Sequence, residues 1–298
     1  MRHPIDRKTV LVTGASTGFG RDIAETLSRA GHRVFASMRD TAGKNRLHAD
    51  ALRAQSIDVV DLDVTDAASV DRAVETVLGE TGRIDVLINN AGIAAGGVTE
   101  SFTVEQTQAL FDVNVFGVLR VTRGVLPTMR RQGDGLIVNV GSILGRVTFP
   151  FFGIYGASKF ALEALTDSLR YELSQLGVDV TLVQPSPYPT PMYTSVQQPL
   201  DPSRAVEYGE IGEIPGAMFE HFMSVFSADD APNPHDVAEA IEKLVATAKG
   251  KRAARTIVGG APFGADAVNT STAPVQAEVL ASLGLVHLDG VALMNSAA

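Results

Sequence analysis

The sequence predicts an α/β fold in which helices cover both faces of a doubly wound, mostly parallel sheet of seven strands. Short apolar runs typical of buried strands alternate with helical patterns from residue 9 to residue 258, and this alternation is typical of a parallel sheet. A glycine-rich turn also separates the first strand from the first helix, where such folds hold phosphate groups. We expect a single domain that spans residues 1–298.

Composition supports one globular domain and argues against several kinds of function. The chain has 298 residues, of which 45% are hydrophobic, so it can bury a full core. Its net charge of −9 and the absence of any long Lys/Arg run argue against a nucleic-acid partner. It has no cysteine, and its six histidines are isolated from one another. We therefore expect no disulfide, no cysteine nucleophile and no metal site.

No stretch of the sequence has the pattern of a membrane span or a secretion signal. Eighteen consecutive apolar residues occur nowhere, and the apolar run that begins at Thr9 is too short for a signal-peptide core. We therefore expect a soluble, cytoplasmic protein with no membrane span.

The first strand and helix form the predicted phosphate-binding end. Residues 9–13 are an apolar strand, and Gly14, Gly18 and Gly20 follow before a helical pattern that closes at Gly31. Glycines allow a tight turn and close approach of a ligand to the backbone. The helix amino terminus adds unpaired N–H groups and the positive end of its dipole, which favour a pyrophosphate.

The second strand, residues 33–38, ends at Arg39 and Asp40. In dinucleotide-binding folds this position contacts the adenine ribose: an acid binds both ribose hydroxyls of NAD, whereas an arginine binds the 2′-phosphate of NADP. We expect Arg39 to make this contact and NADP(H) to be favoured over NAD(H). A register shift of one residue would give the role to Asp40 instead.

Ser16 allows a second interpretation of the glycine-rich turn. Gly14-Ala-Ser16-Thr-Gly18 matches the nucleophile elbow of α/β-hydrolases. A hydrolase also needs an acid and a histidine later in the chain, for which His287 with Asp266 or Asp289 is available. A hydrolase with Ser16 as its nucleophile is therefore an alternative.

Two more strands continue the alternation. Residues 57–62 form one strand, and Asp63 follows it, where it could bind an adenine amino group or cap the helix that begins near Asp66. Residues 85–89 form the next, which ends in Asn89-Asn90-Ala91-Gly92. The helix predicted from Thr103 is apolar on more than one face, so it needs a second packing partner besides the sheet.

Tyr155 and Lys159 begin a long apolar helix and share one of its faces, because residues four apart lie side by side. A fixed ammonium lowers the pKa of a neighbouring phenol, which could then transfer protons near neutral pH. Ser142 ends the preceding strand, where its hydroxyl could hold a substrate oxygen. The spacing alone is also compatible with a packed tyrosine and a solvated lysine.

Taken together, the motifs resemble the short-chain dehydrogenase/reductase family. The glycine turn, Asn89-Asn90-Ala91-Gly92, Asn114, Ser142, Tyr155 with Lys159, and Pro185 with Thr190 occur in the family's order between residues 9 and about 192. The resemblance implies a Rossmann-type fold and an oxidoreductase that transfers hydride between NADP(H) and a carbonyl or alcohol carbon. It implies that Ser142, Tyr155 and Lys159 are catalytic, with Asn114 completing a proton relay through water to Lys159.

The resemblance also implies a dinucleotide site, in which Thr190 binds the nicotinamide carboxamide. With Arg39, the expected cofactor-binding residues are Gly14, Ser16, Thr17, Gly18, Phe19, Gly20, Asp63, Val64, Asn90, Ala91, Gly92, Tyr155, Lys159, Pro185 and Thr190. Two alternatives stay open. Asn114 could simply bond a backbone carbonyl and bend its helix, and the protein could be a dinucleotide sensor without turnover.

A proline-rich segment rich in aromatic residues and methionine follows the strand at residues 179–183. It predicts a loop with a short apolar helix at about 188–228, which in the family covers the substrate. With Ser142 and Tyr155, the expected substrate-binding residues are Tyr188, Met192, Phe219 and Phe222. Because the segment has no cluster of Lys or Arg, its composition favours a hydrophobic ketone or secondary alcohol.

The remaining sequence predicts a helix from Val237 and a seventh strand at residues 255–258. The tail contains a possible helix near 275–283 and an apolar run at 291–294. In the family, the helices after Thr103 and Tyr155 pair with their copies in a neighbouring subunit. The resemblance therefore implies a homodimer or homotetramer.

Overall fold

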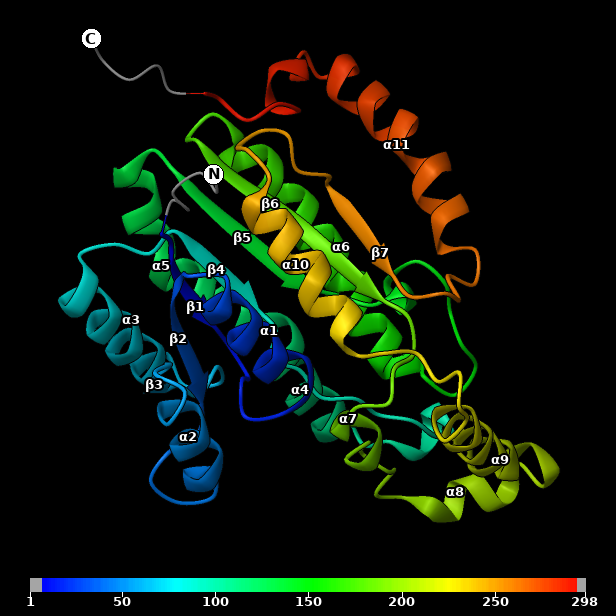
Figure 1. Ribbon diagram of the computed structural model, residues 1–298. Coiled ribbons are helices and arrows are strands. Elements are labelled where there is room, and N and C mark those ends of the chain that lie inside the picture. The colour runs from blue at the N-terminus through cyan, green and yellow to red at the C-terminus, as the bar shows by residue number, and fades with distance from the viewer. Residues whose placement is uncertain (1–6, 294–298) are drawn as a thin grey trace, which may run out of the picture.

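The computed structural model describes residues 7–293 and confirms the doubly wound α/β fold (Figure 1). Its strands are β1 (Thr9–Val12), β2 (Arg33–Met38), β3 (Asp58–Asp61), β4 (Val86–Asn89), β5 (Gly135–Val140), β6 (Val178–Pro185) and β7 (Arg255–Val258). They form one seven-stranded, all-parallel sheet in the order β3-β2-β1-β4-β5-β6-β7. The order reverses between β1 and β4, and ligands of open parallel sheets bind at such a point.

Part of the predicted domain lies outside the described residues. The structure does not describe residues 1–6 or 294–298. The interpretation of the amino terminus depends partly on the first range, and the second contains the end of the apolar run at 291–294. Within residues 7–293, no helix is both long and apolar enough to cross a bilayer. The same residues contain no group of three or more acidic or histidine side chains placed to hold a metal.

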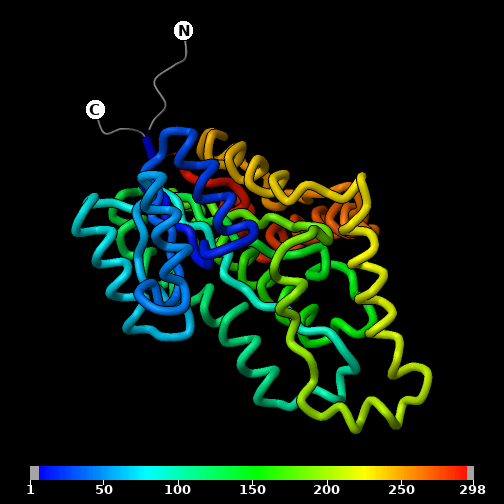
Figure 2. Tube along the Cα trace, turned by 60° about the horizontal axis from the view of Figure 1, so that its bottom comes forward, coloured from blue at the N-terminus to red at the C-terminus, as the bar shows by residue number. Residues whose placement is uncertain are grey.

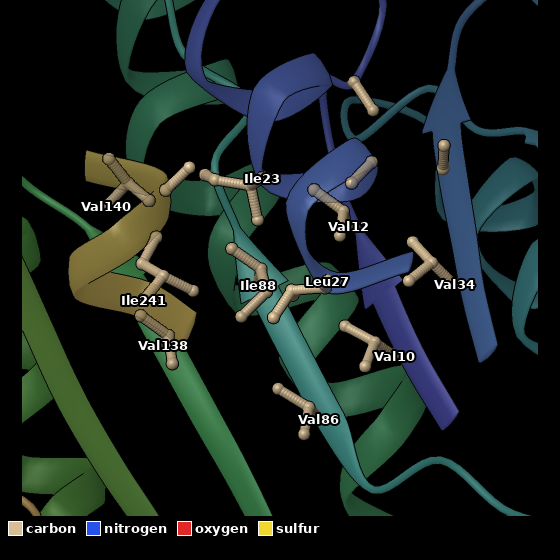
Figure 3. Close-up of a cluster of buried hydrophobic side chains, with 14 of the residues drawn as sticks. Val10, Val12, Ile23, Leu27, Val34, Val86, Ile88, Val138, Val140 and Ile241 are labelled. Carbon is tan, nitrogen blue, oxygen red and sulfur yellow. The ribbon is translucent and has the colours of Figure 1, made fainter. Parts of the chain in front are cut away.

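Each face of the sheet has its own apolar core. Helices α1 (Gly18–Arg29), α2 (Arg46–Arg53) and α10 (His235–Ala246) pack on one face, and α3 (Ala67–Thr81), α5 (Val118–Gln132) and α6 (Gly153–Ser174) on the other. Figure 3 shows the first core, where Val10 and Ile88 of the strands meet Leu27 of α1. Because successive strand residues point to opposite faces, Leu11 belongs to the second core. Burial on both faces explains the uninterrupted apolar runs of these strands.

The helix predicted from Thr103 runs without a gap but is not α-helical throughout. It consists of α4 (Val104–Phe111), a π-helical turn η2 (Asp112–Gly117), and α5. Thr103 caps α4 with Gln106, as its spacing predicts. The π-helical turn was not predicted, because apolar periodicity assumes a constant rotation per residue. Such turns are rare and frequently occur at functional sites.

The segment between β6 and α10 forms three helices instead of a loop with one short helix. They are α7 (Pro191–Thr194), α8 (Pro202–Glu207) and α9 (Glu210–Phe226), the last of 17 residues. Pro191 and Pro202 occupy the first helical positions, where a missing N–H costs nothing. The prolines therefore start helices here rather than prevent them. Figures 1 and 2 show this part, hereafter the lid (residues 188–228), projecting beyond the sheet.

Two side-chain contacts hold the ends of the lid against the core. The hydroxyl of Tyr188, at its beginning, donates a hydrogen bond to the Asp236 carboxylate over 3.1 Å. His235, just after its end, lies with Nδ1 2.9 Å from a carboxylate oxygen of Asp22 in α1. The two ends of the lid are therefore neighbours.

The carboxyl-terminal helix is longer than predicted. Helix α11 (Ala265–Ser282) begins ten residues before the predicted start near 275 and lies beyond β7 in Figure 1. Asn269 of α11 donates a hydrogen bond to Gln184 of β6. A short turn, η4 (Val286–Leu288), follows, and Gln175 at the end of α6 donates to the backbone carbonyl of His287. The tail is thus attached to the β6 side of the sheet.

Candidate active site

The three residues predicted to be catalytic lie together at the carboxyl end of the sheet. Ser142 follows β5 and caps a short turn, η3 (Ile143–Gly145), by accepting a hydrogen bond from the Leu144 N–H. Tyr155 and Lys159 occupy the first two turns of α6. All three are buried and line one cavity, hereafter the reaction cavity.

The Lys159 ammonium lies over the face of the Tyr155 ring, 5.6 Å from the ring centroid. It donates a hydrogen bond of 3.0 Å to the backbone carbonyl of Val140, the last residue of β5. Burial lowers the pKa of Lys159 to about 8, because the charged form is poorly solvated. The side chain therefore remains mostly charged at neutral pH.

The pKa of Tyr155 is shifted in the direction opposite to the prediction. Burial raises it to about 12, although the neighbouring Ser142 hydroxyl lowers it. The predicted lowering by Lys159 is not found, because desolvation of the buried phenolate is the largest cause of the shift and it raises the pKa of Tyr155. At neutral pH the phenol therefore carries its proton.

Asn114 lies in the π-helical turn and bonds mainly to backbone. Its Oδ1 accepts from the N–H of Ile93, and its Nδ2 donates to the Ile93 carbonyl, both over 2.9 Å. Nδ2 also donates to Ser158, whose hydroxyl donates to the carbonyl of Tyr155. The backbone bonding that we considered as an alternative role for Asn114 is therefore found in the structure. The proton relay to Lys159 stays a prediction.

A second, larger cavity contains the predicted dinucleotide site. It has a volume of about 790 Å³ and extends from the ends of β2 and β3, past the glycine turn, to α7. The predicted cofactor residues that line it are Gly14, Ser16, Thr17, Gly18, Phe19, Gly20, Arg39, Asp63, Val64, Asn90, Ala91, Gly92 and Thr190. Tyr155, Lys159 and Pro185 line the reaction cavity instead. Phe19, Asn90 and Thr190 line both, so the two cavities adjoin.

The glycine turn fits a diphosphate. A Cβ on Gly14 would lie 2.8 Å from the Ala91 backbone, and one on Gly20 would lie 2.3 Å from Asn90, so neither position tolerates a side chain. At Gly18, φ is +56° and no neighbouring atom lies within 3.7 Å of such a Cβ, which leaves the groove open. Helix α1 begins here without a side-chain cap. Its free N–H groups and positive dipole end therefore suit an anionic phosphate.

Arg39 and Asp40, at the ribose end of this cavity, make different contacts. The Asp40 carboxylate accepts a 2.7 Å bond from the N–H of Lys44, within its own turn. Arg39 is 63% exposed, and its guanidinium lies 3.8 Å from Asp63 across the cavity. Asp63 accepts bonds from Thr65, and Asp66 rather than Asp63 caps α3. Arg39, Asp40 and Lys44 all line this end of the cavity, and Asp40 is the one bonded within its own turn.

Three of the four lid residues expected to bind substrate line the reaction cavity. These are Tyr188, Met192 and Phe222. Phe219 lines a neighbouring cavity instead, because it lies one helical turn earlier on α9. Tyr188 is 1% exposed and packs edge-on against Phe19, so it is part of the core as well as the cavity wall.

Sequence reasoning missed several apolar residues of the reaction cavity. They are Ala94, Ile143, Leu144, Phe149, Phe152, Tyr193 and Val196. One signal was available for two of them: Phe149 and Phe152 stand in the loop that joins Ser142 to Tyr155, and so must lie near both. Lys159 is the only Lys or Arg among the described residues that line this cavity.

The structure does not bring together the residues of the alternative hydrolase. Ser16 follows the carboxyl end of β1, whereas the backbone of His287 is bonded to Gln175, just before the amino end of β6. In a parallel sheet, the carboxyl ends and the amino ends of the strands lie on opposite sides of the molecule. The nucleophile and histidine of a hydrolase are therefore separated by the length of the strands.

A family model described as short chain dehydrogenase matches residues 8–201. The chain belongs to this family of oxidoreductases. The 3-ketodihydrosphingosine reductase of Bacteroides thetaiotaomicron is 40% identical to it over 184 residues, which cover 61% of this chain and 64% of the reductase. Retinol dehydrogenase 8 of Bos taurus is 33% identical over 257 residues, which cover 81% of this chain and 79% of that enzyme. The chain thus spans less than two thirds of the length of the first relative.

Solved structures of the family share the fold. An actinorhodin polyketide ketoreductase solved with NADPH is 31% identical, with a TM-score of 0.72 over 86% of this chain and 97% of that one. A short-chain dehydrogenase/reductase from Burkholderia phymatum, in complex with NAD, is 27% identical, with a TM-score of 0.73 over 92% and 97%. Both kinds of nicotinamide dinucleotide therefore occur among the structural neighbours.

Proposed function

We propose that this dehydrogenase is an NADP(H)-dependent enzyme that interconverts a carbonyl and an alcohol on a hydrophobic ketone or secondary alcohol. The observation that carries the proposal is the convergence of Ser142, Tyr155 and Lys159 in a cavity that adjoins a dinucleotide-shaped groove. This set of residues also argues against a sensor without turnover, since binding alone does not require the phenol.

The nicotinamide dinucleotide, when bound, supplies or accepts the hydride. In the reducing direction, Tyr155 donates its proton to the carbonyl oxygen, and the Ser142 hydroxyl donates a hydrogen bond to the same atom. A general acid must hold its proton at the working pH, and burial ensures this for Tyr155. Lys159, anchored on Val140, keeps its positive charge beside the Tyr155 ring while the proton moves, and it would hold the nicotinamide ribose.

The preference for NADP(H) is supported by the charge at the ribose end of the groove. Arg39, Lys44 and His48 line that end together with Asp40 and Asp63. The two carboxylates are already engaged, because Asp40 accepts from the N–H of Lys44 and Asp63 accepts from Thr65. A guanidinium can bind a 2′-phosphate through two hydrogen bonds. The neighbouring ketoreductase, which was solved with NADPH, is consistent with this preference.

The hydrophobic substrate is supported by the lining of the reaction cavity. Phe149, Phe152, Tyr193 and Phe222 form part of the wall. Among the described residues that line the cavity, Lys159 is the only Lys or Arg, and its ammonium is bonded to the Val140 carbonyl. The names of the two relatives refer to a ketone and an alcohol.

The test is NADPH consumption with a panel of ketones and aldehydes, followed by ultraviolet absorbance. We expect turnover of apolar ketones, with a loss of about 10² or more in Tyr155→Phe and nearly unchanged NADPH affinity. Ser16→Ala provides a contrast: it should abolish a hydrolase but have only a mild effect here, because Ser16 lines the dinucleotide cavity and does not line the reaction cavity. Absence of NADPH consumption with every compound, or full activity in Tyr155→Phe, contradicts the proposal.

A further inference from the structure

A second apolar chamber adjoins the reaction cavity beneath α9. It lies between α9 and the loops at residues 96–97 and 151–152, and Phe151, Gly216, Met218 and Phe219 line it. We call it the outer chamber. Its volume is about 280 Å³, against about 80 Å³ for the reaction cavity. Most of the space available to an apolar ligand therefore lies away from Tyr155.

The two spaces share one wall, which consists of side chains. Phe152, Tyr193, Val196 and Phe222 line both. The Phe222 ring packs edge-on against Phe152, with centroids 6.3 Å apart, and lies 5.9 Å from the Tyr193 ring. Three of these residues belong to the lid, and Phe152 belongs to the loop before α6. The two spaces are therefore separated by side chains of the lid and of the loop before α6, and not by a strand of the sheet.

The chamber selects against charge. None of the described residues that line it is charged, and the polar side-chain groups there are the Gln198 amide and the Tyr193 hydroxyl. The surrounding helices α8 and α9 carry Glu207, Glu210, Glu213 and Glu220. Their one arginine, Arg204, is paired with Glu100 and Asp201. An anionic chain end would be repelled here, whereas an uncharged apolar chain would bury its surface.

We propose that the outer chamber holds the tail of the substrate, and that the substrate is an uncharged ketone or alcohol with a long apolar chain. Its reactive carbon lies at Tyr155 and its chain passes the shared wall at Phe222. This inference rests on the proposed function, because it takes Tyr155 as the reacting end. It also gives Phe219 a role that the reaction cavity does not.

A series of methyl ketones of increasing chain length tests the inference. We expect kcat/KM to rise about fourfold for each added methylene until the chain fills both spaces. Gly216→Phe places a ring on a chamber position that has no neighbouring atom within 4 Å of its Cβ. It should lower kcat/KM for the longest ketones by about tenfold or more and leave the shortest unchanged. Ile211→Phe, at an exposed position of the same helix that lines neither space, is the matched control.

The inference is overturned if kcat/KM stops rising at the same chain length in wild type and in Gly216→Phe. A preference for carboxylate-bearing ketones also overturns it. An equal loss for short and long ketones in Gly216→Phe also overturns it, provided that Ile211→Phe is normal. If no ketone is reduced with NADPH or NADH, the proposed function fails instead.

A binding measurement tests whether a long ketone occupies the outer chamber, and it does not require turnover. The chain has no tryptophan, so Phe219→Trp gives a single reporter in the outer chamber. Addition of 2-dodecanone should shift its emission to shorter wavelength, whereas butanone should not. The shift should disappear when Gly216→Phe is added. An emission that does not respond to the long ketone, or responds equally to both, contradicts occupation of the chamber.

Discussion

Lys159 carries a positive charge into a site from which protein atoms exclude water. Its ammonium is bonded to one backbone carbonyl and lies over a neutral ring. Within residues 7–293, no carboxylate forms an ion pair with it, and burial lowers its pKa. Desolvation of such a charge costs free energy that the folded state must bear. Active sites commonly sacrifice stability in this way.

Lys159→Met should therefore abolish turnover and yet stabilise the protein. Because the folded pKa of Lys159 is lowered from 10.5 to about 8, the folded state binds the proton less tightly than the unfolded state does. The lysine thus destabilises fully below about pH 8, and the penalty disappears as pH rises toward 10.5. After about 1 kcal/mol for the lost hydrogen bond to Val140, we expect a gain of about 1–2 kcal/mol at neutral pH.

Urea unfolding of wild type and Lys159→Met at about pH 7 and about pH 10 measures this difference. The variant's advantage should be smaller at the higher pH. A variant that is less stable at neutral pH, or an advantage independent of pH, contradicts the argument.

Arg39→Ala should remove the preference for NADPH. A charge-assisted bond to the 2′-phosphate is worth about 1.5–3 kcal/mol, so wild type should bind NADPH roughly 10- to 100-fold more tightly than NADH, and less so at high salt. Titration calorimetry with both dinucleotides measures the ratio. Arg53→Ala, an exposed arginine that lines neither cavity, should leave it unchanged. Equal affinities in wild type refute the assignment.

The position of a single site residue can be predicted from the sequence where the spacing along a helix alone determines which side chains lie together. Tyr155 and Lys159 share a helix face whatever surrounds them, and both are where we expected them. Their pKa values could not be predicted, because desolvation depends on burial by residues far apart in the sequence. Arg39 and Asp40 could be separated only by the turn in which Asp40 bonds to Lys44.

The three helices of the lid are held more weakly than those that pack on the sheet. None of the residues of α7, α8 and α9 is buried. The lid is joined to residues 94–106 largely through exposed polar contacts, among them those of Arg204 and Tyr208 with Glu100. Exposed ion pairs add little stability, so these helices should open locally before the core does.

Hydrogen exchange should show this difference directly. We expect the amides of α7 to α9 to exchange faster than those of α10, and to slow when NADPH and an apolar ketone are added together. Glu100→Gln, which removes the charge shared by Arg204 and Tyr208, should accelerate exchange in α8 and leave α10 unchanged. Protection of the free lid equal to that of α10 contradicts this prediction.

Among the elements, strands and sheet-packed helices were predictable because burial imposes a regular pattern on them. The π-helical turn was not, since it depends on Asn114 bonding across to Ile93, 21 residues earlier. Helix α11 was predicted too short for a similar reason. Its first half has no strong apolar period, and contacts such as that of Asn269 with Gln184 hold it in place.

The molecule as a whole leaves apolar surface on the helices that the family pairs between subunits. Val104 of α4, Phe116 of the π-helical turn and Phe160 of α6 are 67%, 48% and 43% exposed. The described part of the tail does not cover them. Large exposed apolar side chains on neighbouring helices are typical of protein interfaces.

We therefore predict a dimer or tetramer that Phe160→Glu converts to smaller species. A buried charge at an interface without a partner costs several kcal/mol, which is enough to dissociate it. Sedimentation at micromolar concentration measures the mass. Leu47→Glu, which changes an even more exposed apolar residue on α2, should have no effect. A wild-type monomer contradicts the prediction.

The attachment of the lid has a consequence for how such an enzyme changes over evolution. Tyr188 and His235 hold the two ends of the lid beside each other, on Asp236 and Asp22, so everything between them begins and ends at nearly one point. The entropy of closing a loop grows slowly with its length. The part of this segment beyond Thr190 is therefore replaceable as a unit: a foreign segment of different length could be inserted between Thr190 and His235. Substrate range can then diverge while Ser142, Tyr155 and Lys159 keep their geometry.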